Sequence, residues 1–216
     1  MAGLRLDAIG HRLLAPVGLT LAAGEMVFLS GPSGSGKSLL LRAIADLDPN
    51  TGEVWLGDEA RSSMTPPHWR RRVGLLPAES FWWAESVGKH FPVTKTATAS
   101  ALPPMVDWLA QLGFDPDVLN WSIARLSTGE RQRLALVRLL AQKPEALLLD
   151  EATANLDPAG RGRVETLVDT YRRNVRAAVL WVSHDPEQRQ RLAEISDVQS
   201  IGRSYVIRDG RLEPES

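Results

Sequence analysis

Residues 31–38, GPSGSGKS, match the pattern Gly-x-x-x-x-Gly-Lys-Ser/Thr of a phosphate-binding loop. They lie between a continuous apolar run at 26–31 and a helical stretch, which is the context that such a loop requires. Glycines let the backbone wrap closely around phosphates with consecutive N–H groups pointing inward, and the helix dipole adds positive potential. We therefore expect Lys37 to reach the β- and γ-phosphates of a nucleotide and the Ser38 hydroxyl to ligate Mg²⁺.

An acidic pair ends the segment ALLLDE at residues 146–151. A carboxylate at the end of a buried strand lies at the edge where open α/β sheets bind ligands. We expect Asp150 to hold Mg²⁺ through water and Glu151 to act as general base towards an attacking water molecule. The alternative is an acidic pair at a helix N-terminus with no catalytic part, which is common in proteins.

His184 follows another apolar run, AAVLWVS at residues 177–183. A single histidine is more often structural than functional. This one ends a strand beside the two that carry the nucleotide chemistry, where a neutral imidazole can sense a γ-phosphate by hydrogen bonding. We therefore predict a functional role for His184.

A further polar turn opens the segment LSTGERQRLALVRLL at residues 126–140. Ser127 and Gly129 can offer a hydroxyl and a backbone N–H to an anion. Leu134 and Val137 then recur at helical spacing. These apolar side chains would anchor the helix in a core and so fix the direction in which its N-terminus points. A plain helix N-cap would look the same, and the residues of this segment alone leave both interpretations open.

Composition limits the classes of function. The chain has 216 residues, 44% of them hydrophobic and 24% charged, with a formal net charge of −1. This length fits one substantial core, and the near-neutral charge argues against a general nucleic-acid binder, whose affinity comes largely from phosphate neutralisation. Cysteine is absent, which excludes disulfides and thiol chemistry. We interpret the arginine runs at 70–72 and 172–173 as solvated helix faces.

The segment RLLAPVGLTLAAGE at residues 12–25 resembles a signal peptide in composition. Asp7 before it and the interruptions at Pro16 and Gly18 argue against that interpretation and favour strand material. No run approaches 18 consecutive apolar residues, so no membrane-spanning segment is predicted.

The remaining patterns predict the elements that position these residues. Short strands of a β layer are predicted at 4–9, 17–21 and 53–57, buried strands at 26–31, 72–77, 146–151 and 177–185, and a hairpin at 204–213. Helices are predicted after the phosphate-binding loop, at 105–114, from the polar turn at 127 to Lys143-Pro144, and between the last two buried strands, whereas 92–104 is interpreted as a loop. Strands that alternate with helices predict an α/β fold with a mostly parallel sheet covered on both faces.

The order of these features resembles that of the ATP-binding cassette (ABC) ATPases, and the resemblance covers nearly the whole chain. GPSGSGKS resembles the Walker A motif, LLLDE Walker B, ANLD (154–157) the D-loop and His184 the switch histidine. LSTGE resembles the family signature, usually Leu-Ser-Gly-Gly-Gln. The residues implied to bind ATP are Gly31, Pro32, Ser33, Gly34, Ser35, Gly36, Lys37, Ser38 and Leu39, and those implied to complete a partner's ATP site are Ser127, Thr128, Gly129 and Glu130.

The resemblance carries expectations about fold, cofactors and partners. It implies one ABC ATPase domain over 1–216, with a P-loop core and N-terminal antiparallel β layer at 1–77 and 127–216 and a helical subdomain near 78–126. It implies hydrolysis of Mg-ATP in a head-to-tail dimer, with Lys37, Glu151 and His184 in catalysis, and a separate transmembrane permease. The chain would lie on the cytoplasmic face of the cell membrane and bind no nucleic acid. RLSTGERQRLALVRLL and AVLWVSHD are most similar to the small ATPase subunits of two-component bacterial systems proposed to export iron.

Three departures from the family pattern stand out. Ala78 occupies the position of the usual Gln after the strand at 72–77, and the adjacent Glu79 is the candidate to substitute as a metal contact. No aromatic residue is available to stack on adenine before the second strand, which leaves His11 as the nearest planar side chain. Thr128 replaces a usual glycine, so the turn must avoid a positive φ there.

The segment ESFWWAESVGKHF at 79–91 is rich in aromatic residues, which are enriched at interfaces. In the family this region faces the membrane subunit. Trp82 and Trp83 are equally compatible with the core of the helical subdomain, and because they are adjacent we expect one to be buried and one exposed.

Other functions remain as alternatives. A nucleotide kinase shares the phosphate-binding loop but has no use for LSTGE or ANLD. A soluble ABC-type ATPase without a transport role, or a nucleotide-binding regulator with little turnover, is compatible with Ala78. Nothing in the sequence has the ligand spacing of an iron site.

Overall fold

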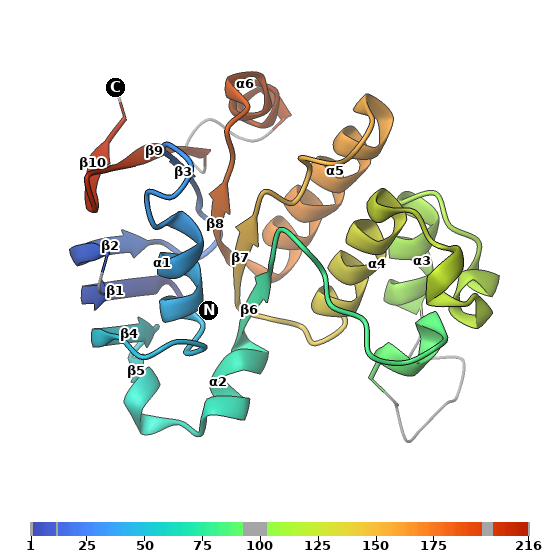
Figure 1. Cartoon of the computed structure of the whole chain (residues 1–216), viewed down its shortest axis with the longest axis horizontal. Helices are drawn as coiled ribbons and strands as arrows, with labels where there is room; N and C mark the ends of the chain where they lie inside the picture. Colours follow the sequence, from blue (N-terminus) through green and yellow to red (C-terminus); the bar gives the residue numbers. More distant parts are fainter. Residues whose placement is uncertain (1, 12, 93–102, 196–200, 216) are drawn as a thin grey trace.

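The computed structural model describes residues 2–11, 13–92, 103–195 and 201–215. Two sheets lie on either side of helix α1 (Lys37–Ile44), as Figure 1 shows. The first sheet is antiparallel, with strand order β2-β1-β4-β5: β1 (Leu4–His11), β2 (Leu14–Leu21), β4 (Thr51–Leu56) and β5 (Glu59–Ala60). The second has the order β10-β9-β3-β8-β7-β6: β3 (Met26–Ser30), β6 (Val73–Leu76), β7 (Ala146–Asp150), β8 (Ala178–Val182), β9 (Ile201–Arg208) and β10 (Arg211–Pro214).

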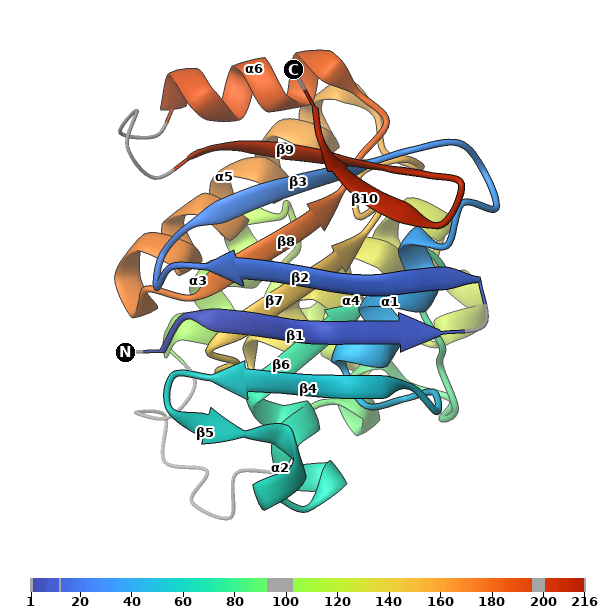
Figure 2. The same cartoon turned by 90° about the vertical axis from the view of Figure 1, so that its left-hand side faces the viewer.

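All neighbours in the second sheet are parallel except β9 and β10, which form an antiparallel hairpin (Figure 2). The predicted fold class, a mostly parallel core with an N-terminal antiparallel layer, is therefore confirmed. Asp209 and Gly210 both have positive φ at the hairpin turn, 47° and 73°, as a tight turn of this hand requires.

Helices cover the other face of the parallel sheet (Figure 1). The further α-helices are α2 (Pro66–Arg72), α3 (Pro103–Gln111), α4 (Thr128–Leu140), α5 (Pro158–Val175) and α6 (Pro186–Ile195). Short 3-10 helices are η1 (Arg61–Ser63), η2 (Val87–His90), η4 (Pro116–Asn120) and η5 (Ile123–Arg125). Elements η2, α3, η4 and η5 gather at one end of the molecule beside α4 and form its helical part (Figure 1).

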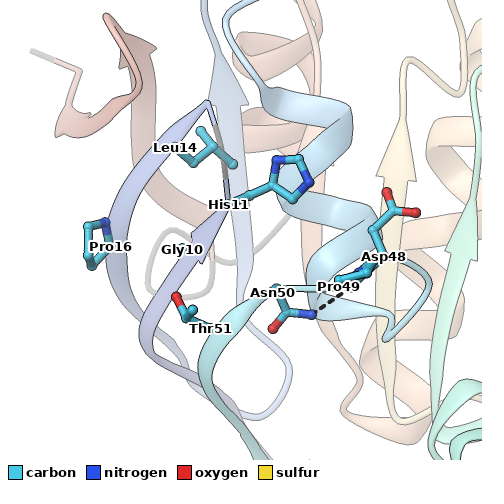
Figure 3. A pocket seen from close by; sticks show the side chains of 8 residues that line it. All are labelled: Gly10, His11, Leu14, Pro16, Asp48, Pro49, Asn50 and Thr51. Carbon is cyan, nitrogen blue, oxygen red and sulfur yellow. Dashed lines mark hydrogen bonds between the residues drawn. The ribbon is translucent and has the colours of Figure 1, made fainter.

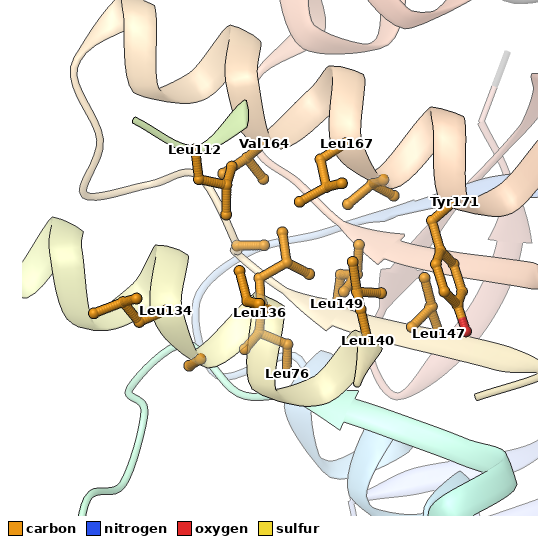
Figure 4. Packing of buried hydrophobic residues seen from close by; sticks show 14 of the residues in the cluster. Leu76, Leu112, Leu134, Leu136, Leu140, Leu147, Leu149, Val164, Leu167 and Tyr171 are labelled. Carbon is orange, nitrogen blue, oxygen red and sulfur yellow. The ribbon is translucent and has the colours of Figure 1, made fainter. Parts of the chain in front are cut away.

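The central strands are apolar because both of their faces are covered. Every residue of β3, β7 and β8 is buried. One face packs against α3, α4 and α5, where Leu136, Leu149 and Leu167 meet (Figure 4). The other face packs with α1 and the antiparallel sheet around residues such as Leu29 and Leu148. These two cores hold β3, β8 and β7 side by side and fix where each strand ends.

The strand ends that matter for function lie level with one another. Val182 of β8 pairs with Leu29 of β3 on one side and with Asp150 of β7 on the other. The segments that follow these three strands therefore emerge at the same edge of the sheet, where parallel sheets bind ligands.

The predicted strands and the main helices are present, with different bounds. Helix α3 begins at Pro103, so the predicted loop at 92–104 is wrong for its last two residues, while 93–102 lie outside the described residues. Helices α2 and α6 were not predicted, because each is short and rich in polar residues. No helix in the described parts of the chain is long and apolar enough to cross a membrane.

The interpretation of the second arginine run as a solvated face is wrong for Arg172. The Arg172 side chain is 2% exposed and is paired with Asp169, and it donates a hydrogen bond to the carbonyl of Gly24. Arg173 remains about half exposed and is also paired with Asp169. A buried guanidinium is tolerated here because a carboxylate and a carbonyl receive its donors.

Candidate functional site

The phosphate-binding loop, Glu151 and His184 line one cavity of about 330 Å³. The loop contributes residues between Ser33 and Leu39, and Leu13 forms part of the wall. The convergence follows from the level ends of β3, β7 and β8, since each of these groups lies in the segment that follows one of those strands.

The backbone of the phosphate-binding loop has the open form that its glycines predict. Gly34 and Gly36 have φ of 77° and 104°, which L side chains rarely adopt, and a Cβ on Gly36 would lie 2.7 Å from the Leu14 side chain. Lys37 Nζ donates to the carbonyl oxygens of Gly31 and Pro32, at 2.8 and 2.9 Å. The carbonyl groups of the loop therefore hold the Lys37 ammonium group close to the loop backbone, at the N-terminus of helix α1.

Burial changes the proton affinity of the two charged groups nearest the loop. Burial lowers the pKa of Lys37, and the negative charges of Glu151 and Asp150 oppose this shift. Burial also raises the pKa of Asp150, and a hydrogen bond with the Ser38 side chain opposes that shift. In each case a neighbouring group partly offsets the effect of burial on the charged form.

The Ser38 hydroxyl and the Asp150 carboxylate fit a Mg²⁺ ion that is shared with a nucleotide. They are in hydrogen-bonding contact, and both are oxygen donors of the kind that Mg²⁺ prefers. Within the part of the chain that the structure describes, no group of three or more His, Cys, Asp or Glu side chains could hold a metal by itself. Phosphate oxygens would have to supply the remaining ligands, as is usual for Mg²⁺.

Glu151 and His184 are in direct contact. His184 Nε2 lies 3.2 Å from Glu151 Oε1, and both side chains are partly exposed to the cavity. Glu151 has φ of 48°, a left-handed conformation that costs a non-glycine residue about 1–3 kcal/mol and persists only where its surroundings enforce it. Its N–H donates to the carbonyl of Val182 at 3.1 Å, which ties it to the strand that precedes His184.

The polar turn at 127–130 is a helix N-cap with an additional, reciprocal bond. The Glu130 N–H donates to Ser127 Oγ at 3.3 Å, and Glu130 Oε2 accepts from the Ser127 N–H at 2.8 Å. This backbone hydrogen bond and the Ser127 hydroxyl lower the pKa of Glu130. Thr128 is absent from the positive-φ residues, as predicted. A Cβ on Gly129 would approach Leu156 at 3.1 Å, so glycine lets the 154–157 turn pack closely.

None of the residues 127–130 is among the described residues that line the cavity of the phosphate-binding loop. Ser127 and Thr128 are exposed at the start of α4. The structure therefore separates the two candidate anion sites within one chain.

The loop after β6 is tied to helix α4 by a side chain that the sequence analysis missed. Gln132 is buried, donates to the carbonyl of Pro77 at 3.0 Å and accepts from the Ser80 hydroxyl at 2.7 Å. Ala78 is half-buried and Glu79 is exposed, and neither lines the cavity among the described residues. The only available signal for Gln132 was a polar residue on the apolar side of an amphipathic helix.

His11 lines a different cavity from that of the phosphate-binding loop. This cavity, of about 640 Å³, is shown in Figure 3, with Asp48 and Asn50 on its other side. Leu13, 62% exposed, lies instead against the loop and Lys37. The aliphatic Leu13, and not His11, thus lines the cavity of the phosphate-binding loop, and no sequence pattern marked it.

The aromatic segment has one tryptophan in each environment, as predicted. Trp83 is 65% exposed and stacks on Phe81, whereas Trp82 packs against the core. His90 Nε2 accepts from the N–H groups of Trp83 and Ala84, at 2.9 Å each. The segment is therefore held in a defined shape in which the rings of Phe81 and Trp83 are exposed.

Arg138 of α4 also holds the aromatic segment at 79–91 in place. Its guanidinium lies 4.5 and 5.1 Å from the ring centroids of Trp82 and Trp83, and it donates to the carbonyl of Phe81 at 3.0 Å. Desolvation lowers the pKa of Arg138. The exposed aromatic surface and helix α4, which begins at Thr128, are therefore connected through Arg138.

Comparison with known proteins identifies this arrangement. The profile of the family described as "ABC transporter" matches residues 14–154. The chain belongs to the ABC transporter family. Its fold resembles the structure of a bacterial Atm1-family ABC exporter with ATP bound, with a TM-score of 0.77 and 22% identity, over 98% of this chain and 38% of that one.

Curated relatives of this ABC subunit act in both directions. It is 32% identical over 86% of both chains to the "Probable iron export ATP-binding protein FetA" of Escherichia coli K12. It is 37% identical to the "Fe(3+) ions import ATP-binding protein FbpC" of Streptomyces coelicolor, over 94% of this chain and 57% of that protein. It is 36% identical to the "Thiamine import ATP-binding protein ThiQ" of Shigella sonnei, over 94% and 85%. This chain is therefore an ATP-binding subunit of an ABC transporter, and members of this class are ATPases.

Proposed function

We propose that two copies of this subunit bind two Mg-ATP molecules head to tail, hydrolyse them and power a separate membrane subunit. One observation carries the proposal. The phosphate-binding loop, Glu151 and His184 line one cavity, whereas the turn at 127–130 lies outside it with exposed polar groups. A second copy, turned through a two-fold rotation, can bring its turn to the open side of that cavity.

Each residue then has a role in hydrolysis. Backbone N–H groups of the phosphate-binding loop and Lys37 bind the β- and γ-phosphates. A Mg²⁺ ion bound by Ser38, and by Asp150 through water, would supply positive charge against the phosphate oxygens. Glu151 takes a proton from the attacking water. The water oxygen bonds to the γ-phosphorus as the bond between the γ-phosphorus and the ADP oxygen breaks, and ADP leaves. His184 orients the Glu151 carboxylate through their 3.2 Å contact.

The other predicted contacts are parts of the same proposal. Ser127, Thr128, Gly129 and Glu130 complete the partner's ATP site. His11 contributes a planar ring near the base, and Glu79 serves as a metal or water contact beside Ala78. The whole chain, 1–216, acts as one ABC ATPase domain on the cytoplasmic face of the membrane.

The exposed aromatic surface of Phe81 and Trp83 is proposed to contact the membrane subunit. Phe81 and Trp83 are exposed, and their segment is held by Arg138 of α4, the helix that begins at Thr128. Movement of that helix on ATP binding would therefore reach the membrane subunit directly.

We infer export, with iron as the transported ion, from the resemblance to small ATPase subunits of iron-export systems and from the 86% mutual coverage with FetA. Import is a second candidate, favoured by the identities of 36 and 37% to import subunits. Vesicles that contain the ATPase with its co-purified membrane subunit distinguish the two. ATP-driven loss of iron from the ATPase side indicates export, and gain on that side indicates import.

The variant Glu151→Gln tests the core of the proposal. The amide still positions water but cannot take its proton, so turnover should fall about 10²- to 10⁴-fold while ATP binding is retained. Retained ATP should hold the dimer together, since ligand binding favours the associated state. Gel filtration with and without Mg-ATP measures this, and Glu213→Gln, the same change at an exposed position, is the matched control. A variant that stays monomeric with ATP bound, or that hydrolyses at the parent rate, refutes the assignment.

A further inference from the structure

A fully buried side-chain amide lies near the contact between Glu151 and His184. Gln188 of α6 is 0% exposed. Its Oε1 accepts a hydrogen bond from the Ser183 hydroxyl, and its Nε2 donates to Thr153 Oγ1 at 3.1 Å. Burying a side-chain amide without partners costs free energy, so these two bonds determine whether glutamine is tolerated there.

The hydrogen bonds of this amide form a connected series. Ser183 Oγ accepts the backbone N–H of Asp185 at 3.1 Å and donates its own proton to Gln188 Oε1. The Gln188 NH₂ group donates to Thr153 Oγ1. The series therefore runs from the Asp185 N–H through Ser183 Oγ and the Gln188 amide to Thr153 Oγ1.

This chain of bonds joins the two segments that carry Glu151 and His184. Ser183 directly precedes His184, and Thr153 follows Glu151 by two residues. Both also line a cavity of about 240 Å³ together with Glu151 and His184. Gln188 lies on helix α6 and links the two segments, because its side chain is hydrogen-bonded to both Ser183 and Thr153.

The backbone of Glu151 needs such support. Its φ of 48° is strained, and the turn that follows is closed by the Ala154 N–H, which donates to the Glu151 carbonyl at 3.0 Å. Thr153 lies inside this turn, and its hydroxyl is held by Gln188. The amide thus limits how far the Glu151 turn can move relative to His184.

We propose that Gln188 is a positioning residue for ATP hydrolysis, which fixes the spacing between Glu151 and His184. It touches neither reacting atoms nor nucleotide, and it acts through Thr153 on one side and Ser183 on the other. The inference rests on the proposed roles of Glu151 and His184.

The variant Gln188→Met has nearly the same volume and flexibility but neither hydrogen bond. We expect kcat for ATP hydrolysis to fall at least tenfold, while KM and the Kd for a fluorescent ATP analogue change less than twofold. Gln190→Met is the matched control, the same substitution at an exposed position of the same helix, and should keep the parent kcat. An unchanged kcat in Gln188→Met overturns the proposal, as does a parallel loss of kcat, ATP binding and folded protein.

A second pair of variants keeps the test independent of how Gln188→Met folds. Thr153→Val removes the hydroxyl at the same shape, and Thr153→Ser retains it. We expect the kcat of Thr153→Val to fall as in Gln188→Met and that of Thr153→Ser to stay within twofold of the parent. The double variant Gln188→Met/Thr153→Val should be no slower than either single variant, because both break one linkage. Additive losses, or equal losses in both Thr153 variants, contradict the linkage.

Hydrogen exchange separates failure of this inference from failure of the proposed function. In Gln188→Met, amide exchange should rise within 151–156 and 183–185 and remain unchanged in β1 and β2. If Gln188→Met exchanges its amide hydrogens at the same rates as the parent in all of these segments, the positioning role is overturned. Glu151→Gln is measured in parallel, since parent-like turnover in that variant refutes the role of Glu151 whatever Gln188 does.

Discussion

Mixing two inactive variants should restore ATP hydrolysis if each site combines two chains. Lys37→Ala removes the ammonium group from the phosphate-binding loop, and Ser127→Arg fills the space that the partner's ATP needs. In a heterodimer, one site joins both mutated elements and is inactive, while the other joins two unmutated elements and is whole. Random pairing at equal concentrations gives half heterodimers, so about a quarter of all sites are intact.

The structure also gives the cost of the second substitution. Ser127 caps α4, and losing this cap with its reciprocal Glu130 bond costs about 1 kcal/mol, or about 2–4 °C in Tm for a chain of this size. Ser127→Arg should therefore fold at room temperature. Ser122→Arg, at the exposed N-cap of η5, removes a comparable cap outside the proposed site and should keep its activity.

A coupled steady-state ATPase assay at several mixing ratios, with differently tagged chains to count heterodimers, measures the rescue. Each pure variant should be inactive, and the equal mixture should reach up to about a quarter of the parent rate per chain. If heterodimers form and neither hydrolysis nor retention of one ATP per heterodimer appears, the composite-site reasoning is refuted.

Three other predictions concern the metal ligand, the aromatic surface and the altered loop. Burial raises the pKa of Asp150, so the folded state holds this proton more tightly than the unfolded state and stability falls as pH rises through the titration of the carboxyl group. Asp150→Asn should remove that fall and raise Tm at pH 7 in calorimetry, and an unchanged or lower Tm contradicts the sign. Trp83→Ala should keep basal ATPase activity and weaken co-purification of the membrane subunit about thirtyfold in affinity, whereas Trp82→Ala should instead lower Tm; equal co-purification by Trp83→Ala and parent excludes the proposed contact. Ala78→Gln should change ATPase activity across a Mg²⁺ titration and Glu79→Ala should lower it, and parent-like curves for both would leave this loop without a catalytic part.

Much of the fold followed from local pattern. The strands β3, β7 and β8 were predicted from continuous apolar runs, because a strand covered on both faces has no place for polar side chains. The phosphate-binding loop followed from its glycine spacing, which sets a backbone shape that few other sequences adopt. Helices α2 and α6 were missed because neither has enough apolar periodicity to be distinguished from a polar connection.

The sequence by itself determined which residues end or follow the buried strands, and from this it predicted that Lys37, Asp150 and Glu151 belong near phosphate. His184 was predicted on a strand beside those two, but only the tertiary structure decided that this strand, β8, lies between β3 and β7, which brings His184 Nε2 to 3.2 Å from Glu151. It also decided that Arg172 is buried and that Leu13 rather than His11 lies against the phosphate-binding loop. Local spacing encodes helix, strand and turn, because those depend on neighbours along the chain. The environment of a polar side chain depends instead on which distant segment packs against it, and that is fixed only when the sheet order and the helix packing are in place.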